Sequence, residues 1–392
     1  MTDFRQILFS EILRDAHRYA GGLEPARPTT AGRRSAGRLP PAPRAREGIR
    51  LGRDRLRDVI ERSAARAGLS RRHFDPELAA ARLGRIHELS DGLAHTYEQL
   101  ADTASQRALI DLLKLRVLGP YHTSLHISPE RYRAEQDRVD RELRVTADTI
   151  HVSDPWFSPL SLYRLNVDGA AISLHSHSVD IVSVFALGQY HHPAVHVSAG
   201  DVVLDVGGCW GDTALYFASR VGPHGRVYTI EFDPENLEVM QANLALNPQL
   251  ASRIEVLEHA LWDTPGRQLN YVQAGRSSTV LGDDGTKAGR RVHTVTLDEL
   301  ADGLGLQRLD FIKMDIEGAE PRALRGGNAT IKRFGPKLAL AAYHRDDDLV
   351  VLPRQVRALS AGYRMYLGSY SPVEDETVLF AAPSATSRSS ST

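Results

Sequence analysis

The sequence is poor in cysteine and has no excess of charge of either sign. Its 392 residues include a single cysteine, Cys209, which excludes an internal disulfide and is typical of a reducing compartment. Lysine and arginine number 48 against 49 aspartate and glutamate residues, so the formal net charge of −1 gives no reason to expect nucleic-acid binding. The sequence also lacks an Asn/Asp-Pro-Pro-aromatic motif that could grip a flipped base.

Long hydrophobic runs are missing as well. No apolar segment approaches the ~20 residues that a membrane-spanning helix needs. No sustained apolar region follows the first residues, so we expect no signal peptide, no membrane partner and a cytoplasmic location. A hydrophobic content of 42% and a charged content of 25% are ordinary for a globular protein, and the length allows two domains.

The first 150 residues are predicted to be helical, with one irregular stretch. Residues 1–48 combine a short helix over 3–20 with a flexible linker, because 24–48 is rich in proline, arginine, alanine and glycine. Residues 49–150 show apolar side chains at spacings of three and four, which predicts a helical domain or lid. If the protein is a homo-oligomer, we expect copies to associate through these N-terminal helices.

Residues 151–198 form a mixed connecting segment. Leu162–Val167 and Ala170–Leu174 flank an Asp-Gly pair, which predicts a hairpin, and Asp180–Tyr190 is expected to be a short helix. Four histidines lie here, at positions 175, 177, 191 and 192. Without a pattern of carboxylates around them, their spacing favours substrate contacts or exposed loops over a metal site.

In residues 199–383, predicted strands alternate with predicted helices. The strands are Val202–Val206, Arg226–Glu231, Ile254–Leu257, Asp310–Asp315 and Leu338–Tyr343. Such alternation predicts an α/β fold with a doubly wound, mostly parallel sheet. Tyr363–Leu367 and Thr377–Ala381 have only a loop between them, which predicts a C-terminal antiparallel hairpin, and residues 384–392 are expected to be a disordered tail.

A glycine-rich turn between the first of these strands and a helix predicts a cofactor site. Gly207, Gly208 and Gly211 do not follow the Gly-x-Gly-x-x-Gly pattern of dinucleotide-binding turns. Asp205 and Asp212 flank the turn, where two carboxylates would repel a pyrophosphate but suit the ammonium and sulfonium of S-adenosylmethionine. The next strand ends in an acidic residue that is placed to bind ribose hydroxyls. We therefore expect these residues to bind S-adenosylmethionine: Asp205, Gly207, Gly208, Gly211, Asp212, Glu231, Phe232, Ala260, Leu261 and Asp315.

Several motifs in residues 160–383 together resemble FkbM-type methyltransferases. They are Asp310-Phe-Ile-Lys-Met-Asp-Ile-Glu-Gly-Ala-Glu320, Asp205-Val-Gly-Gly, Glu231-Phe-Asp-Pro, Ala260-Leu-Trp-Asp263, Val295-Thr-Leu-Asp298, Tyr343-His-Arg-Asp and Glu376-Thr-Val-Leu379. The resemblance implies a class I (Rossmann-like) methyltransferase fold. It also implies O-methylation of a hydroxyl on a sugar, a polyketide or another secondary metabolite. Gly208-Cys209-Trp210 and Leu367-Gly-Ser-Tyr370 depart from the family pattern, so contacts to the methionine end of the cofactor and to the substrate are expected to differ there.

In methyl transfer to a hydroxyl, the enzyme must align the oxygen with the methyl group, and a base must remove the hydroxyl proton. His344 is the first candidate base because the ordinary pKa of imidazole lies near neutral pH. Asp315 and Glu317 are further catalytic candidates, which could orient His344 or bind Mg²⁺, an ion left open as a second cofactor. Arg276, Ser277 and Ser278 are expected in a loop beside a hydroxylated small-molecule substrate, together with His344.

Two other functions stay open on the sequence alone. The first is a carboxylate O-methyltransferase acting on a natural product, which would need no base. The second is a binding module without catalytic activity, whose N-terminal helices recruit a partner.

Overall fold

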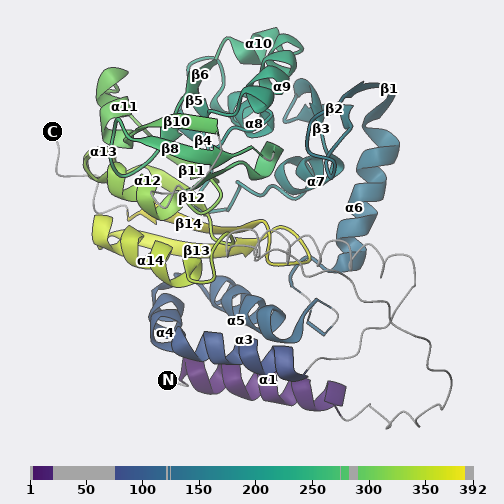
Figure 1. Ribbon diagram of the computed structural model, residues 1–392, viewed down its shortest axis with the longest axis vertical. Coiled ribbons are helices and arrows are strands. Elements are labelled where there is room, and N and C mark those ends of the chain that lie inside the picture. The colour runs from purple at the N-terminus through teal and green to yellow at the C-terminus, as the bar shows by residue number, and fades with distance from the viewer. Residues whose placement is uncertain are drawn as a thin grey trace, which may run out of the picture.

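The computed structural model describes residues 3–20, 76–120, 122–123, 125–273, 275–281 and 290–384. A seven-stranded sheet forms its centre (Figure 1). In spatial order its strands are β13 (Tyr363–Ser369), β14 (Thr377–Pro383), β12 (Lys337–Ala341), β11 (Phe311–Met314), β4 (Val202–Val206), β5 (Arg226–Glu231) and β6 (Ile254–Glu258). The strands from β12 to β6 are mutually parallel, whereas β14 is antiparallel to both of its neighbours.

The chain order of the strands reverses at β4. From this central strand the chain moves outward through β5 and β6, and it later returns to β11 on the opposite side. In an open parallel sheet, a crevice for ligands forms beyond the carboxyl ends of the strands at such a reversal. The sheet therefore places its ligand crevice between the ends of β4, β5 and β11.

Helices cover both faces of this sheet. They are α8 (Asp212–Val221), α9 (Pro234–Ala245), α10 (Pro248–Ala251), α11 (Leu297–Gly303), α12 (Glu320–Gly326), α13 (Asn328–Phe334) and α14 (Asp348–Leu359). Side chains alternate along the strands, so Leu204 and Val206 join one buried cluster while Val203 joins another on the opposite face. Both faces are buried, as expected for a parallel sheet covered by helices.

The sequence predicts these elements well where local signals are strong. Asp233 accepts a hydrogen bond from the backbone N–H of Glu235 at 3.0 Å, and Pro234 begins α9, which confirms the predicted start of that helix. The five predicted parallel strands are confirmed to within two residues at each end.

Elements with weak local signals were not predicted. A second sheet contains β7 (Ala260–Leu261), β10 (Arg290–Val295), β8 (Gln268–Val272) and β9 (Thr279–Leu281). Residues 144–150 form strand β1 (Arg144–Ile150) rather than a continuation of the helices. The predicted helix over 180–190 is instead a short α7 (Ser178–Asp180) that continues into a π-helix, η1 (Ile181–Ala186).

Helices from the first part of the chain lie beside β13 and α14 (Figure 1). They are α1 (Phe4–Ala20), α3 (Pro76–Glu88), α4 (Ser90–Gln99) and α5 (Thr103–Leu118). The backbone N–H of Ala101 donates to the carbonyl of Met365 at 2.8 Å, and the hydroxyl of Thr96 donates to the carbonyl of Leu349 at 2.8 Å. These helices therefore share a core with the sheet. The predicted linker over 24–48 lies outside the described residues.

A third group of elements packs against α8 and α9. Helix α6 (Pro129–Glu142) begins after Ser128, whose hydroxyl accepts a hydrogen bond from the N–H of Arg131 at 3.2 Å. Strands β2 (Leu160–Val167) and β3 (Ala170–Ser176) form the predicted hairpin, with β1 on the outer edge of β2. Together with α7 and η1, these elements bring residues 150–190 close to the crevice.

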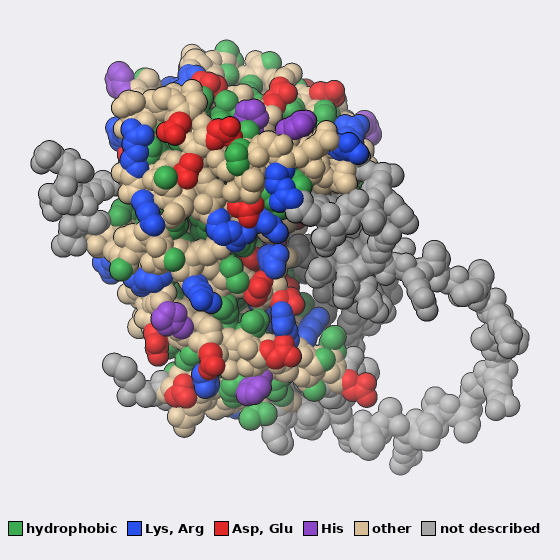
Figure 2. All heavy atoms as spheres, turned by 60° about the vertical axis from the view of Figure 1, so that its left-hand side comes forward, with side chains coloured by type: hydrophobic (Ala, Val, Ile, Leu, Met, Phe, Trp, Pro, Cys, Tyr) green, Lys and Arg blue, Asp and Glu red, His purple; other side chains and the backbone are tan. Residues whose placement is uncertain are grey.

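On the face shown in Figure 2, acidic and basic side chains are interspersed, in keeping with the balanced composition. None of the described helices is both long and apolar enough to cross a membrane.

Candidate active site

The glycine turn after β4 brings the chain close to two neighbouring strands. The N–H groups of Gly207 and Gly208 both donate to the carbonyl of Ile230, at 2.9 and 3.0 Å. A Cβ at Gly207 would lie 2.0 Å from the carbonyl oxygen of Asp315, and the φ of +84° also requires glycine there. A Cβ at Gly208 would lie 2.1 Å from the hydroxyl of Thr229. Only glycine therefore allows the turn to pack between β5 and β11.

A first cavity opens beyond the ends of β4, β5 and β11. Its apolar wall contains Ile230, Phe232, Leu261, Val280 and Ile316. Glu231 also lines it and accepts hydrogen bonds from three backbone N–H groups, those of Cys209, Phe232 and Asp233. Burial raises the pKa of Glu231 to about 7, although these hydrogen bonds oppose the shift. The cavity thus combines an apolar slot with the buried carboxyl group of Glu231.

A second cavity adjoins the first and is rich in polar groups. It is lined by Asp180, Val184, Gln189, Tyr190, Gly207, Cys209, Trp210, Asp212, Thr213, Arg276, Lys313, Asp315, Glu317, Tyr343 and Glu376. Five residues line both cavities, namely Gly207, Cys209, Arg276, Asp315 and Glu317. The two cavities therefore meet at the glycine turn and at the loop after β11.

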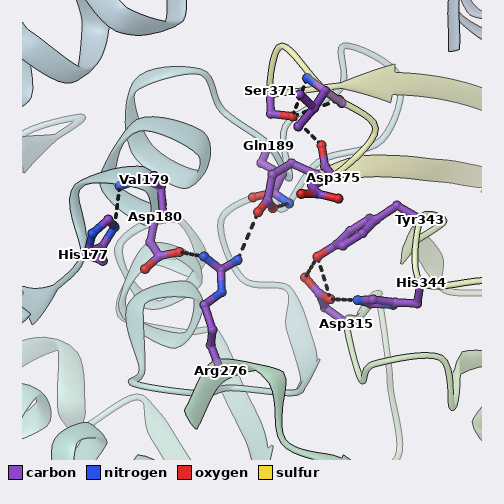
Figure 3. Close-up of polar contacts among 12 residues, drawn as sticks. His177, Val179, Asp180, Gln189, Arg276, Asp315, Tyr343, His344, Ser371 and Asp375 are labelled. Atoms are coloured by element: carbon purple, nitrogen blue, oxygen red, sulfur yellow. Dashed lines mark hydrogen bonds and ion pairs between the residues drawn. The ribbon is translucent and has the colours of Figure 1, made fainter. Parts of the chain in front are cut away.

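Arg276 closes this junction from the opposite side. Its guanidinium forms ion pairs with Asp180 at 2.6 Å and Glu376 at 3.0 Å, and it lies 5.1 Å from the ring centre of Phe157. Figure 3 shows the Arg276 side chain reaching from the β8–β9 segment to Asp180. The amide of Gln189 also donates to the carboxylate of Glu376. Arg276 thus connects its own segment to those of Asp180 and Glu376 around the second cavity.

Asp315 lies at the end of β11 among three donors. The hydroxyl of Tyr190 donates to it at 2.8 Å and that of Tyr343 at 3.2 Å, while the Nε2 of His344 lies 3.3 Å away (Figure 3). Burial would raise the pKa of Asp315, but the charges of Lys313 and His344 outweigh it and lower the pKa. Asp315 is therefore an ionised carboxylate at the junction of the two cavities.

His344 is enclosed by carboxylates and lines neither cavity. Its Nδ1 lies 2.9 Å from Glu320, and its Nε2 lies 3.3 Å from Asp315 and 3.6 Å from Glu317. Burial alone would lower the pKa of His344, but Glu320 and Glu317 raise it well above its usual value. The imidazole is therefore protonated at neutral pH, and this geometry does not favour His344 as the base.

The carboxylates around His344 also determine whether a metal ion could bind there. Asp315, Glu320 and His344 each offer one ligand atom within 4.8 Å of the others. A metal would require a neutral imidazole, whereas the surrounding carboxylates keep His344 protonated. The set expected from the sequence, Asp315 with Glu317, is occupied by this imidazolium. These residues do not fit Mg²⁺, which prefers a set of oxygen ligands.

Asp205, expected to bind the cofactor, lies behind the glycine turn and lines neither cavity. It accepts hydrogen bonds from Thr213 at 2.8 Å and Thr229 at 3.1 Å, and the Nζ of Lys313 lies 3.3 Å away. Asp205 and Lys313 are register partners on β4 and β11, so both side chains point to the same face of the sheet. The expected pairing of Lys313 with a carboxylate is confirmed.

The other predicted site residues divide between the cavities. Six line the first cavity, namely Gly207, Glu231, Phe232, Ala260, Leu261 and Asp315. Asp212 lines the second cavity, while Gly208 and Gly211 shape the turn without lining either. Of the predicted substrate loop, Arg276 lines both cavities, Ser278 lines the first and donates to Asp233 at 2.7 Å, and the Ser277 side chain lies outside the described residues.

Sequence reasoning missed several residues of the second cavity. Asp180 ends α7, and Gln189 and Tyr190 lie in the loop after η1, where the sequence predicted an ordinary helix. Glu376 and Tyr343 lay within quoted motifs, but no spacing rule connected them to a site. π-helical segments are often found at functional sites, but neither hydrophobic periodicity nor a motif of residues 178–190 distinguishes one from an α-helix.

Comparison with known proteins identifies the domain that contains the glycine turn. Residues 199–365 match the family model of the methyltransferase FkbM domain. This match assigns a methyltransferase FkbM domain to these residues, which are less than half of the chain. The resemblance predicted from the sequence motifs is thereby confirmed for these residues.

The chain is similar to individual known proteins only at low identity or over a short part of its length. The crystal structure of a methyltransferase FkbM from Methylobacillus flagellatus KT is 20% identical, with a TM-score of 0.49 over 76% of this chain and 60% of that one. An Aeropyrum pernix fibrillarin solved with bound S-adenosyl-L-methionine is 15% identical, with a TM-score of 0.35 over 60% of this chain and 98% of that one. A catechol O-methyltransferase from Mycobacterium tuberculosis is 37% identical over 62 residues, which are 16% of this chain and 28% of that protein.

Proposed function

We propose that the protein is an S-adenosylmethionine-dependent O-methyltransferase that methylates a hydroxyl of a small molecule, such as a sugar moiety or another secondary metabolite. One observation carries the proposal. Two cavities meet at the glycine turn of the FkbM domain, one with an apolar slot and one lined by polar side chains. Two adjoining cavities at the switch point of a parallel sheet suit a donor and an acceptor whose reacting atoms meet at the junction.

The residues of the first cavity fit the donor. Phe232, Leu261 and Ile316 provide an apolar slot for adenine. Glu231 faces this cavity and can accept hydrogen bonds from the ribose hydroxyls. Asp212, in the adjoining cavity, has no hydrogen-bond or ion-pair partner among the described residues and can bind the ammonium of the methionine end. Trp210 lies next to it and shapes the space for that end.

When bound, the donor supplies a methyl group on a positively charged sulfur. The acceptor hydroxyl would attack this carbon as the carbon–sulfur bond breaks, and its proton must pass to a base. We assign the base role to Glu317 rather than His344, because Glu317 lines both cavities at their junction. Asp315 and His344 then position Glu317, since the imidazolium contacts both carboxylates.

The φ of Glu317, +55°, supports this assignment. A left-handed conformation costs a residue other than glycine about 1–3 kcal/mol and is concentrated at functional sites. Glu317 adopts this conformation in the loop directly after β11, and its side chain lines both cavities.

A carboxylate acceptor is the weaker alternative. The second cavity already contains several carboxylates, so an anionic acceptor would be repelled. A binding module without catalytic activity would bind S-adenosylmethionine weakly or not at all.

Calorimetry with S-adenosylmethionine, followed by incubation with labelled donor and candidate acceptors, tests the proposal. We expect saturable donor binding and transfer of label to hydroxylated acceptors, with the same rate in the presence and absence of EDTA. Absence of donor binding would refute the enzyme assignment, and loss of transfer in EDTA would refute the metal-independent mechanism.

The affinity for the donor should depend on pH through Asp212. Burial and the nearby charge of Asp180 raise the pKa of Asp212 to about 7, so its carboxylate forms as the pH rises through neutrality. Because only the carboxylate attracts the donor ammonium, we expect the Kd for S-adenosylmethionine to fall about fivefold to tenfold from pH 6 to pH 8. Asp212→Asn should bind more weakly and show a much flatter pH dependence in calorimetry. An unchanged slope in this variant would place the donor ammonium elsewhere.

A further inference from the structure

Carboxylates outnumber cations in the lining of the second cavity. Its lining carboxylates are Asp180, Asp212, Asp315, Glu317 and Glu376, while its lining cations are Lys313 and Arg276. Lys313, Asp315 and Glu317 lie together at the end of β11, whereas the others come from four further segments of the chain, so the excess is a property of the assembled site. An excess of buried negative charge is costly unless a ligand balances it.

Both cations are already occupied by the protein. Arg276 is paired with Asp180 and Glu376, so its guanidinium is held by two carboxylates. Lys313 donates to the carbonyl of Gly207 at 2.6 Å and is paired with Asp205 behind the turn. Among the described lining residues, no cation is therefore left to receive an anionic group of a ligand.

Two features of the lining carboxylates indicate a ligand site. Asp212 is 8% exposed and has no hydrogen-bond or ion-pair partner among the described residues. Glu317 and Glu376 both have left-handed backbones, with φ values of +55° and +65°. Cys209 is a third such residue in the lining, so three of the four left-handed residues other than glycine in the described chain surround the cavities. Strain concentrated in this way marks a site for a ligand.

We propose, resting on the proposed function above, that the second cavity accepts a hydroxylated molecule that carries a protonated amine near the methylated hydroxyl. The donor brings one net positive charge, on its sulfonium, because its ammonium and carboxylate cancel. The imidazolium of His344 supplies a second charge beside Asp315 and Glu317. Lys313 also pairs with Asp205, and His344 also contacts Glu320. The available cations therefore do not offset all five lining carboxylates, and a cationic acceptor balances the excess.

The remaining lining residues suit the same class of acceptor. Tyr190, Trp210 and Tyr343 bring three aromatic rings to the cavity. Aromatic faces attract ammonium groups and pack against the apolar faces of sugar rings. Gln189 adds an amide near Glu376. The acceptor class is therefore a polyhydroxylated amine, such as an amino sugar, rather than a sugar acid.

Three pyranoses that differ mainly in charge test the proposal. The protein is saturated with S-adenosylhomocysteine, and binding of glucosamine, N-acetylglucosamine and glucuronate is measured by ligand-observed NMR at neutral pH, with and without EDTA. We expect glucosamine to bind at least tenfold more tightly than N-acetylglucosamine and glucuronate to bind most weakly, with no effect of EDTA. Equal or reversed affinities, or no saturable binding of glucosamine, would overturn the proposal. Binding that EDTA abolishes would also overturn it, because the charge would then serve a metal.

A pair of variants separates the cavity's charge from general effects. Glu376 lines only the second cavity, and Glu376→Gln keeps an oxygen that can accept from Arg276. We expect this variant to lose most of the preference for glucosamine over N-acetylglucosamine. Asp302→Asn, which changes a carboxylate on α11 whose side chain is 81% exposed, should keep it. Equal preferences in the two variants would contradict the proposal.

Binding of S-adenosylhomocysteine distinguishes failure of the proposed function from failure of the inferred acceptor class. If S-adenosylhomocysteine does not bind, the proposed function itself fails. If it binds and glucosamine shows no preference, only the inferred acceptor class fails.

Discussion

Replacing Lys313 with methionine is expected to lower the free energy of unfolding by about 3–5 kcal/mol. Lys313 is 2% exposed, and its Nζ lies 3.3 Å from the fully buried carboxylate of Asp205. Removing the lysine leaves this charge in an apolar core, with only two threonine hydroxyls to solvate it. The loss also breaks the hydrogen bond to the carbonyl of Gly207, which fixes the cofactor turn.

Urea denaturation measures this prediction through a lower midpoint at an unchanged slope. The double variant Asp205→Asn with Lys313→Met should recover most of the loss, because the uncompensated charge is then gone. Lys332→Met, at an exposed position of α13, serves as the matched control and should change the stability little. A Lys313→Met variant as stable as this control would show that the buried pair does not support the fold.

The parallel sheet could be predicted because its signals are local. Each strand is a short apolar run, and capping residues such as Asp233 with Pro234 mark where the helices between the strands begin. The order of the strands is also strongly constrained, since alternating strands and helices give right-handed crossovers and few topologies. The sheet β7-β10-β8-β9 lacks such signals, because its strands are short and polar and pair across a long separation in sequence.

The candidate site was predictable only in part, for a similar reason. Residues of the cofactor cavity follow their strands directly, so Glu231 and Phe232 can be placed from the position of β5 alone. Asp205 could not be assigned correctly, because its role depends on the register that sets it beside Lys313. The base could not be assigned either, since three carboxylates brought together by the fold change the protonation of His344.

The second cavity shows the limit of sequence reasoning most clearly. Asp180 and Glu376 are almost two hundred residues apart and meet only through Arg276. No periodicity or motif connects these three positions. The sequence does predict that a ligand crevice lies at the carboxyl ends of the parallel strands, although it does not predict which side chains line that crevice.

Substituting Glu317 with glutamine should lower kcat for methyl transfer by about 10²–10⁴-fold, the range that general base catalysis supplies. The amide keeps the size of the side chain and its place at the junction of the cavities, but it cannot take the hydroxyl proton. Single-turnover rates with labelled donor and a saturating acceptor measure the loss at the chemical step. Glu238→Gln, an exposed position on α9, is the matched control and should keep the original rate.

The pH profile of the same variants decides between Glu317 and His344. If Glu317 is the base, the residual rate of Glu317→Gln should rise with pH, because hydroxide must then remove the proton. His344→Gln should retain more activity than Glu317→Gln, since the imidazolium only positions the carboxylates at 3.3 and 3.6 Å. A Glu317→Gln enzyme within threefold of the original rate, beside an inactive His344→Gln, would return the base role to the histidine. The protonated state of His344 would then have to change when the donor binds, because its Nε2 could accept a proton only after losing the one it shares with these carboxylates.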